Sequence, residues 1–359
     1  DFITKLLFVH NGPVHKFSIS TPHLNIGPEI DQWLLFVSRK DIRELVIELK
    51  DGSWITVPSC IFSCDKLTRL ELSMCQLDIP PNFSGFPFLK YLKLMHFYTD
   101  IDDLDNLISS SPCLESLELT YPEDQPIELR IRAEKLKSLY MEGDFINVFP
   151  EHTPCLVIIV IDMLVTDDDV EGFKNCDFEK FLQSVPKLER IVGRTYFTRF
   201  LSLCNKASIS SLQYAHTTQK HVKMIELCGV GFHDFEEVLV VLRLIRSCPN
   251  LKSLKISVST DAVDAIEDAD MESLWDEDSF SSIMWSLDEL KSVEFTDLCG
   301  VNYETEFIKF VLMHSPRLEE FVISPSNEDT DLASPDKRFD FFIRLLAFKR
   351  ASPNASILF

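Results

Sequence analysis

A short pattern of apolar residues recurs along the chain. Its clearest copy is LTRLEL (67–72), in which leucine occupies the first, fourth and sixth positions. The last three positions alternate between apolar and polar side chains, as a short strand with one buried face requires. The copies start 20 to 39 residues apart, at Val14, Ile42, Leu67, Leu89, Leu114, Leu136, Leu156, Leu188, Val222, Leu251, Leu290 and Leu318. The copy at Leu188 is degenerate, because Gly193 takes the place of its last apolar residue.

Proline gives a second signal with the same spacing. In six copies it stands two positions before the first apolar residue, where it ends a preceding helix and favours extended backbone. These prolines are Pro87, Pro112, Pro154, Pro186, Pro249 and Pro316. The agreement of the two signals indicates true structural repeats.

Amphipathic segments lie between the predicted strands. Their apolar residues recur at three- and four-residue spacing, which predicts helices. The clearest segments are 102–111, 178–185, 235–248 and 304–315.

Together these patterns predict an α/β leucine-rich-repeat solenoid (a horseshoe), with a parallel sheet on the concave face and helices outside. Most repeat steps are close to the 20–29 residues of leucine-rich repeats, and units of this size bury their apolar faces only by stacking. A doubly wound α/β domain would also alternate strand and helix. It would not explain the constant frame, and the Gly-rich phosphate-binding turn often found in such folds is absent from the sequence.

Composition narrows the possible functions. The 359 residues carry a formal charge of −22, which disfavours binding to nucleic acid. No apolar run is long enough to span a membrane, and the first residues lack the pattern of a signal peptide. The ten cysteines include no CxxC pair, so we expect a reducing compartment, the cytoplasm or nucleus.

Several segments resemble plant F-box/FBD/leucine-rich-repeat proteins. Segments 2–20, 30–49 and 57–72 are similar to the region that follows the F-box, and 285–326 with 341–359 is similar to the FBD domain. The resemblance implies a leucine-rich-repeat region over 1–283. It also implies an FBD-like domain over 284–359 that continues and caps the solenoid.

The same resemblance implies a role in protein recognition. In this family the F-box binds a Skp-type adaptor and so joins a cullin ubiquitin ligase. The chain resembles the part that follows the F-box, so we expect the box to be missing from it. We expect contact with the adaptor and the cullin only through that missing F-box. The implied function is substrate recognition for an SCF-type ligase, with target proteins on the concave face or rim.

Candidate chemistry is sparse. Nine histidines are scattered without HExxH or a His/Cys cluster, and no GxSxG motif occurs, so we expect no catalytic, cofactor-binding or metal-binding residues and no enzyme. The insert 261–279 holds nine carboxylates but no glycine for a calcium loop, which favours a solvated loop. Cys75 takes the Asn-or-Cys position of the repeat, and we expect it to be buried and inert.

The side chains between the buried strand residues should face the concave surface. Most are polar, but several apolar and aromatic ones come from nearby repeats, and such a patch is typical of a partner site. The predicted partner-binding residues are Tyr91, Met95, Tyr140, Ile158, Val160 and Arg190. The alternative is that an overhanging loop at 163–177 covers them.

Two other functions stay open. A stand-alone repeat scaffold could bind or inhibit partners without an F-box. A small-molecule receptor would need a deep polar pocket with several converging Arg or Lys side chains, and the cations predicted on the concave face are few.

Overall fold

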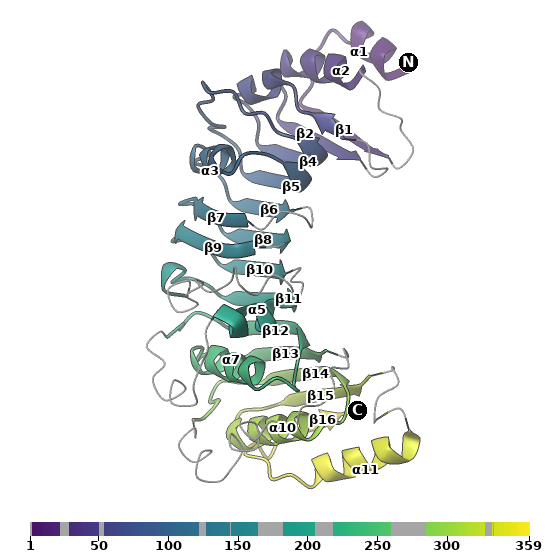
Figure 1. Cartoon of the computed structure of the whole chain (residues 1–359), viewed down its shortest axis with the longest axis vertical. Coiled ribbons are helices and arrows are strands. Elements are labelled where there is room, and N and C mark those ends of the chain that lie inside the picture. Colours follow the sequence, from purple (N-terminus) through teal and green to yellow (C-terminus); the bar gives the residue numbers. More distant parts are fainter. Residues whose placement is uncertain are drawn as a thin grey trace. The chain divides into compact units, whose positions relative to one another are not determined.

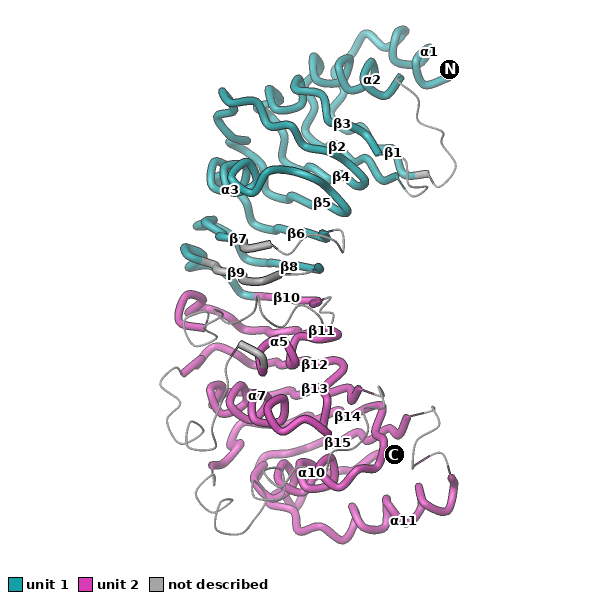
Figure 2. The backbone as a smooth tube through the Cα atoms, in the orientation of Figure 1, with its two compact units in different colours: residues 1–157 teal, residues 158–359 magenta. Residues whose placement is uncertain are grey.

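A computed structural model gives the architecture. It describes residues 2–21, 29–49, 54–121, 127–143, 145–163, 182–204, 218–259, 285–326, 332 and 334–359. The chain forms two compact units, Asp1–Val157 (unit 1) and Ile158–Phe359 (unit 2), which Figure 2 colours separately. Each unit is described by itself.

Unit 1 contains a parallel sheet built from successive repeats (Figure 1). Each strand pairs with the strand of the next repeat in the same register, so that Leu70, Leu92, Leu117 and Leu139 lie side by side. The strands in order are β1 (Lys16–Thr21), β2 (Glu44–Leu49), β4 (Arg69–Gln76), β5 (Tyr91–Tyr98), β6 (Ser116–Thr120) and β8 (Ser138–Gly143), with β3 (Ile55–Thr56) paired to the end of β4.

Unit 2 repeats this arrangement. Ile191, Ile225, Leu254, Val293 and Phe321 are side by side and buried. The strands in order are β10 (Ile158–Met163), β11 (Arg190–Thr195), β12 (Met224–Val230), β13 (Ser253–Val258), β14 (Ser292–Leu298), β15 (Glu320–Pro325) and β16 (Ser356–Leu358).

Helices cover the face to which the frame leucines point. Two of them begin at an aspartate whose side chain accepts the first free backbone N–H: Asp100 from Asp102, and Asp234 from Glu236. Unit 1 holds α1 (Phe2–Val9), α2 (Glu29–Ser38), the 3-10 helix η1 (Ser59–Ser63) and α3 (Ile101–Ser109), and unit 2 holds α5 (Phe197–Cys204), α7 (Phe235–Arg246), α10 (Asn302–His314) and α11 (Pro335–Leu346).

The core is formed by the repeated apolar positions. Leu67, Leu70 and Leu72 are at most 2% exposed, and the corresponding residues of the other repeats are also buried, except in the first repeat, where Val14 and Phe17 are partly exposed. Along most strands burial alternates residue by residue, as the frame predicted. This confirms the α/β solenoid of leucine-rich repeats.

The later repeats of unit 1 differ from the prediction of helices outside. Their outer segments are β7 (Ile127–Arg132) and β9 (Phe145–His152), which form a separate two-stranded parallel sheet (Figure 1). In β7, Leu129 and Ile131 are buried while Arg130 and Arg132 are exposed, so the segment has the two-residue period of a strand. The two repeats that carry these strands start only 22 and 20 residues before the next copy, which leaves little room for a helix.

Three of the predicted helices are confirmed, as α3, α7 and α10. Segment 178–185 is described only from residue 182, and the acidic insert 261–279 lies outside the described residues. The predicted domain boundary at 283/284 also falls outside them and stays a prediction, although β13 and β14 on either side pair in parallel. Within the residues described, none of the helices has the length and apolar character to cross a membrane.

A left-handed residue recurs at the strand ends. In six repeats it stands two positions after the last apolar residue of the frame. The residues with positive φ at this position are Met74 (51°), His96 (46°), Gly143 (142°), Thr195 (38°), Gly229 (72°) and Asp297 (60°). In β4 and β5 the sheet pairing skips this position and resumes one residue later, so it interrupts the regular strand.

Candidate partner-binding surface

The side chains that alternate with the buried ones form what we call the open face of each sheet. Because the strands are in register, these side chains align in rows that cross the strands. In unit 1, the middle row contains Glu71, Lys93, Glu118 and Tyr140. A row of this kind can contact a partner that lies across several repeats.

Charged and aromatic groups of unit 1 are linked across the strands. The Arg69 guanidinium is ion-paired with Glu71 and lies 4.0 Å from the centre of the Tyr91 ring. The Tyr91 hydroxyl donates to Glu118 Oε1 at 2.7 Å, and Lys93 Nζ is 3.5 Å from Glu118 Oε2. Burial, together with this hydrogen bond, raises the pKa of the Tyr91 phenol, so it stays protonated as a donor. The network holds these side chains in fixed positions.

The structure places three of the predicted partner-binding residues on the open face of unit 1. Tyr91, Met95 and Tyr140 are all partly exposed. The Tyr140 hydroxyl donates to Glu142 Oε2 at 2.8 Å, which orients its ring. Met95 pairs in the sheet with Ser73 on one side and Thr120 on the other, so it is the one large apolar side chain in that row segment.

The other three predicted residues lie in unit 2. Ile158 is beside Arg190, and Val160 is beside Val192. Arg190 Nη2 donates to Glu226 Oε2 at 2.9 Å. Val192 is only 2% exposed although it shares a row with Val160, so the apolar part of this row is partly covered.

The predicted patch therefore divides between the units. Tyr140 belongs to unit 1, whereas Ile158 and Val160 belong to unit 2. The overhanging loop predicted at 163–177 lies outside the described residues beyond residue 163. The partner-binding role of all six residues stays a prediction.

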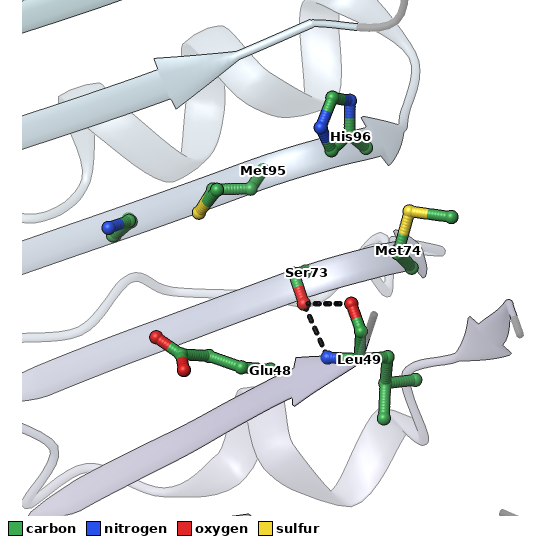
Figure 3. Close-up of a pocket in the computed structure, with 7 residues that line it drawn as sticks. Glu48, Leu49, Ser73, Met74, Met95 and His96 are labelled. Carbon is green, nitrogen blue, oxygen red and sulfur yellow. Dashed lines mark hydrogen bonds between the residues drawn. The ribbon is translucent and has the colours of Figure 1, made fainter. Parts of the chain in front are cut away.

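A hollow opens on unit 1 where β2, β4 and β5 end (Figure 3). Its volume is about 580 Å³. Buried Ser73 lies between the strands of Glu48 and Met95, and its hydroxyl oxygen accepts the backbone N–H of Leu49 at 2.7 Å. The lining residues are Glu48, Leu49, Ser73, Met74, Lys93, Met95 and His96.

Sequence reasoning identified Met95 but missed the hollow. A signal was present: aligning the repeats on their frame places small Ser73 in a row between two longer side chains, Glu48 and Met95. The left-handed backbone at Met74 had no signal, because methionine does not favour it, and His96 gave only a weak one, since histidine adopts it more often than most residues.

The remaining candidates from the sequence are a cysteine and possible metal ligands. Cys75 is fully buried in β4, and burial raises the pKa of its thiol to about 12, which agrees with an inert cysteine. No group of three or more His, Cys, Asp or Glu side chains placed to hold a metal ion occurs in the described ranges.

The stacked parallel strands and their polar open face define a leucine-rich-repeat protein. Residues 30–256 match the family model described as "FBD-associated F-box protein At5g56370, LRR repeats". The chain belongs to the plant F-box/FBD/leucine-rich-repeat family.

Three Arabidopsis thaliana proteins illustrate the similarity. F-box/FBD/LRR-repeat protein At1g13570 is 42% identical over 360 residues, which cover 100% of this chain and 82% of the relative. F-box/FBD/LRR-repeat protein At5g56420 is 25% identical over 100% of this chain and 85% of its own length. Putative F-box/LRR-repeat protein At4g15060 is 26% identical over 75% of this chain and 68% of its own length.

Proposed function

We propose that this chain recognises target proteins through the open face of its sheets, as the substrate-binding part of an SCF-type ubiquitin ligase subunit. The observation that supports this proposal most directly is the linked network on the open face of unit 1, formed by Arg69, Tyr91, Glu118 and Lys93. Side chains already held in place lose little conformational freedom on binding, which favours affinity. The relatives are named as F-box proteins, which supports a link to the ligase through an adaptor that binds the F-box.

Both units contribute contacts in this proposal. Tyr91, Met95 and Tyr140 act in unit 1, with aromatic rings of the kind that dominates binding energies at interfaces. Ile158, Val160 and Arg190 act in unit 2. The cellular site is the cytoplasm or nucleus, where adaptor and target would meet.

Binding, rather than catalysis, is the activity that we propose. A receptor for a small anion has less support than a protein-binding surface. Lys93 is the one Lys or Arg lining the hollow within the described part of the chain, and Glu118 already pairs with it.

Proximity labelling with the full-length protein, combined with measurement of protein turnover, tests the proposal. We expect a Skp-type adaptor among the labelled proteins, together with a target whose half-life lengthens when the protein is removed. The unit 1 variant Tyr91→Ala/Met95→Ala and the unit 2 variant Ile158→Glu/Val160→Glu should each reduce labelling of the target and leave the adaptor signal unchanged.

Matched controls exist for both variants. Phe88→Ala removes a ring that is 57% exposed outside the strands, and Ile343→Glu adds a charge on α11 where the side chain is 49% exposed. Both controls should bind the target normally. The proposal is wrong if no adaptor is labelled, or if both open-face variants keep every target.

A further inference from the structure

Two charged side chains line the hollow on unit 1, Glu48 and Lys93. Glu48 accepts a hydrogen bond of 2.6 Å from the Ser20 hydroxyl but has no ion-pair partner among the described residues. The ammonium of Lys93 is already balanced by Glu118. A ligand in the hollow therefore meets an uncompensated negative charge at Glu48, in a protein whose formal charge is −22.

Two methionines form the apolar and adaptable part of the wall. Met74 and Met95 contribute flexible thioether side chains, which adjust to ligands of different shape. Ser73 lines the hollow between Glu48 and Met95, and its hydrogen bond to the Leu49 N–H makes it rigid. A cavity of about 580 Å³ lies within the range of ligand-binding pockets.

Backbone strain gives an independent observation at the same place. Of the six left-handed strand ends, Gly143 and Gly229 use glycine. Thr195 and Asp297 use their side chains in hydrogen bonds, to Asp162 and from Ser257 respectively, each at 2.7 Å. At the two other positions, Met74 and His96, the side chains make no hydrogen bond within the described part and instead line the hollow. The left-handed backbone at these two positions thus places two side chains on the wall of the hollow.

We propose that this hollow binds a lysine or arginine side chain of a target protein. The cationic end pairs with the Glu48 carboxylate, and the aliphatic stem packs against Met74 and Met95, with His96 at the rim. Long basic side chains combine an apolar stem with a charged tip in this way. The inference rests on the proposed function and adds the class of residue that the target must present.

Methyl NMR provides a test that needs no identified target. The methionine methyl groups of the chain are labelled with ¹³C, and the signals of Met74 and Met95 are assigned from Met74→Leu and Met95→Leu. The probes are n-butylguanidinium and n-butylammonium, with butyrate and n-butanol as matched probes that have the same chain and no positive charge. We expect both cations to shift the two methyl signals at millimolar concentration, and the matched probes to leave them in place.

Two glutamate-to-glutamine variants distinguish binding in the hollow from nonspecific attraction of cations to an acidic protein. Glu48→Gln should weaken cation binding about tenfold, because it removes the charged acceptor. Glu44→Gln changes the net charge equally on the same strand, but Glu44 is already paired with Lys16 at 3.0 Å, so binding should be unchanged. A third variant, Met74→Gly, should weaken binding while leaving the fold intact.

The idea is overturned if butyrate or butanol shifts the two methyl signals as strongly, if no probe shifts them, or if Glu44→Gln weakens binding as much as Glu48→Gln. These results are independent of adaptor labelling and target turnover. Failure of the pocket can thus be told apart from failure of the proposed ligase role.

Discussion

Six of the described repeats turn their backbone left-handed near the strand end, and the chain fills that position in different ways. Gly143 and Gly229 accept the conformation without a side chain, whereas Met74 and His96 carry one. A residue other than glycine pays roughly 1–2 kcal/mol for left-handed backbone. The choice of residue at this position therefore sets a local balance between stability and the side chain that is presented.

Two substitutions measure this balance, one that introduces glycine at the left-handed position and one that removes it. Met74→Gly should stabilise the protein by about 0.5–1 kcal/mol, because strain is relieved but glycine orders at an entropic cost. Gly229→Ala should destabilise it by about 1–2 kcal/mol, since the new Cβ would lie 2.9 Å from the Thr195 carbonyl oxygen at a φ of 72°. Urea unfolding midpoints report both changes. A lower midpoint for Met74→Gly would show that the methionine packs for stability.

At the scale of elements, two helices each carry a buried glutamate in their first turn. Glu237 and Glu304 are the third residues of α7 and α10 and are 5% and 0% exposed. Glu237 Oε2 accepts the Thr198 hydroxyl at 2.7 Å and the Gly231 N–H at 3.0 Å. In α10, Glu304 accepts the N–H groups of the loop that enters the helix. Each carboxylate thus ties a helix to the loop that follows its strand.

These two groups predict a pH dependence of stability. Burial raises the pKa of Glu237 and of Glu304 to about 7, against 4.5 for an ordinary glutamate. The folded state therefore binds more protons than the unfolded state between these values, and stability falls as pH rises from about 4.5 to about 7. Each group contributes up to about 3 kcal/mol to this loss, on the scale of 1.36 kcal/mol per pKa unit. Urea unfolding at pH 5 and pH 8 measures it.

Glutamine variants distinguish the pH dependence of stability that these two groups cause from the pH dependence caused by general charge repulsion in an acidic protein. Both hydrogen bonds of Glu237 go to one oxygen, which the amide oxygen of Glu237→Gln can replace, so this variant should lose only the part of the pH dependence that Glu237 contributes. Glu304 uses Oε1 for the Cys299 N–H and Oε2 for the Gly300 N–H. Glu304→Gln turns one acceptor into a donor and should be less stable than Glu237→Gln at pH 8. An unchanged difference between pH 5 and pH 8 in Glu237→Gln would contradict the assignment.

The elements also show what the sequence can predict. The frame at Leu67 predicted strand, register and buried face, because a period of two leaves one solution when neighbours stack. The helix α7 followed from its three- and four-residue spacing. The outer strand β7 was not predicted, because IELRIR is short and leucine-rich repeats of this kind usually carry a helix at that place, although its apolar residues recur with the two-residue period of a strand.

The candidate site was predictable to a similar degree. Alternation alone placed Tyr91 and Tyr140 on the open face. Their hydrogen bonds to Glu118 and Glu142 depend on side-chain geometry across strands, which one repeat does not specify. The division of the apolar patch between two units likewise depends on contacts throughout the chain, because Val157 and Ile158 are adjacent in sequence and belong to different units.

At the scale of the whole molecule, contacts run mainly between neighbouring repeats, so stability should be distributed along the chain. In such arrays each unit depends on itself and its neighbours. Leu117 is fully buried in β6 between Leu92 and Leu139, and Leu254 is fully buried in β13 between Ile225 and Val293. The two leucines form a matched pair, one in each compact unit.

Replacing each leucine by alanine tests this distribution. Leu117→Ala and Leu254→Ala should each cost about 2–5 kcal/mol locally, through lost contacts and a residual cavity. Hydrogen exchange with mass spectrometry should show lost protection in β5, β6 and β8 for Leu117→Ala, with β14 and α10 unchanged. For Leu254→Ala the loss should fall on β12, β13 and β14, with β5 unchanged. Equal loss of protection in both units would mean that the chain unfolds as one cooperative body, and that a target bound to one unit would stabilise the other.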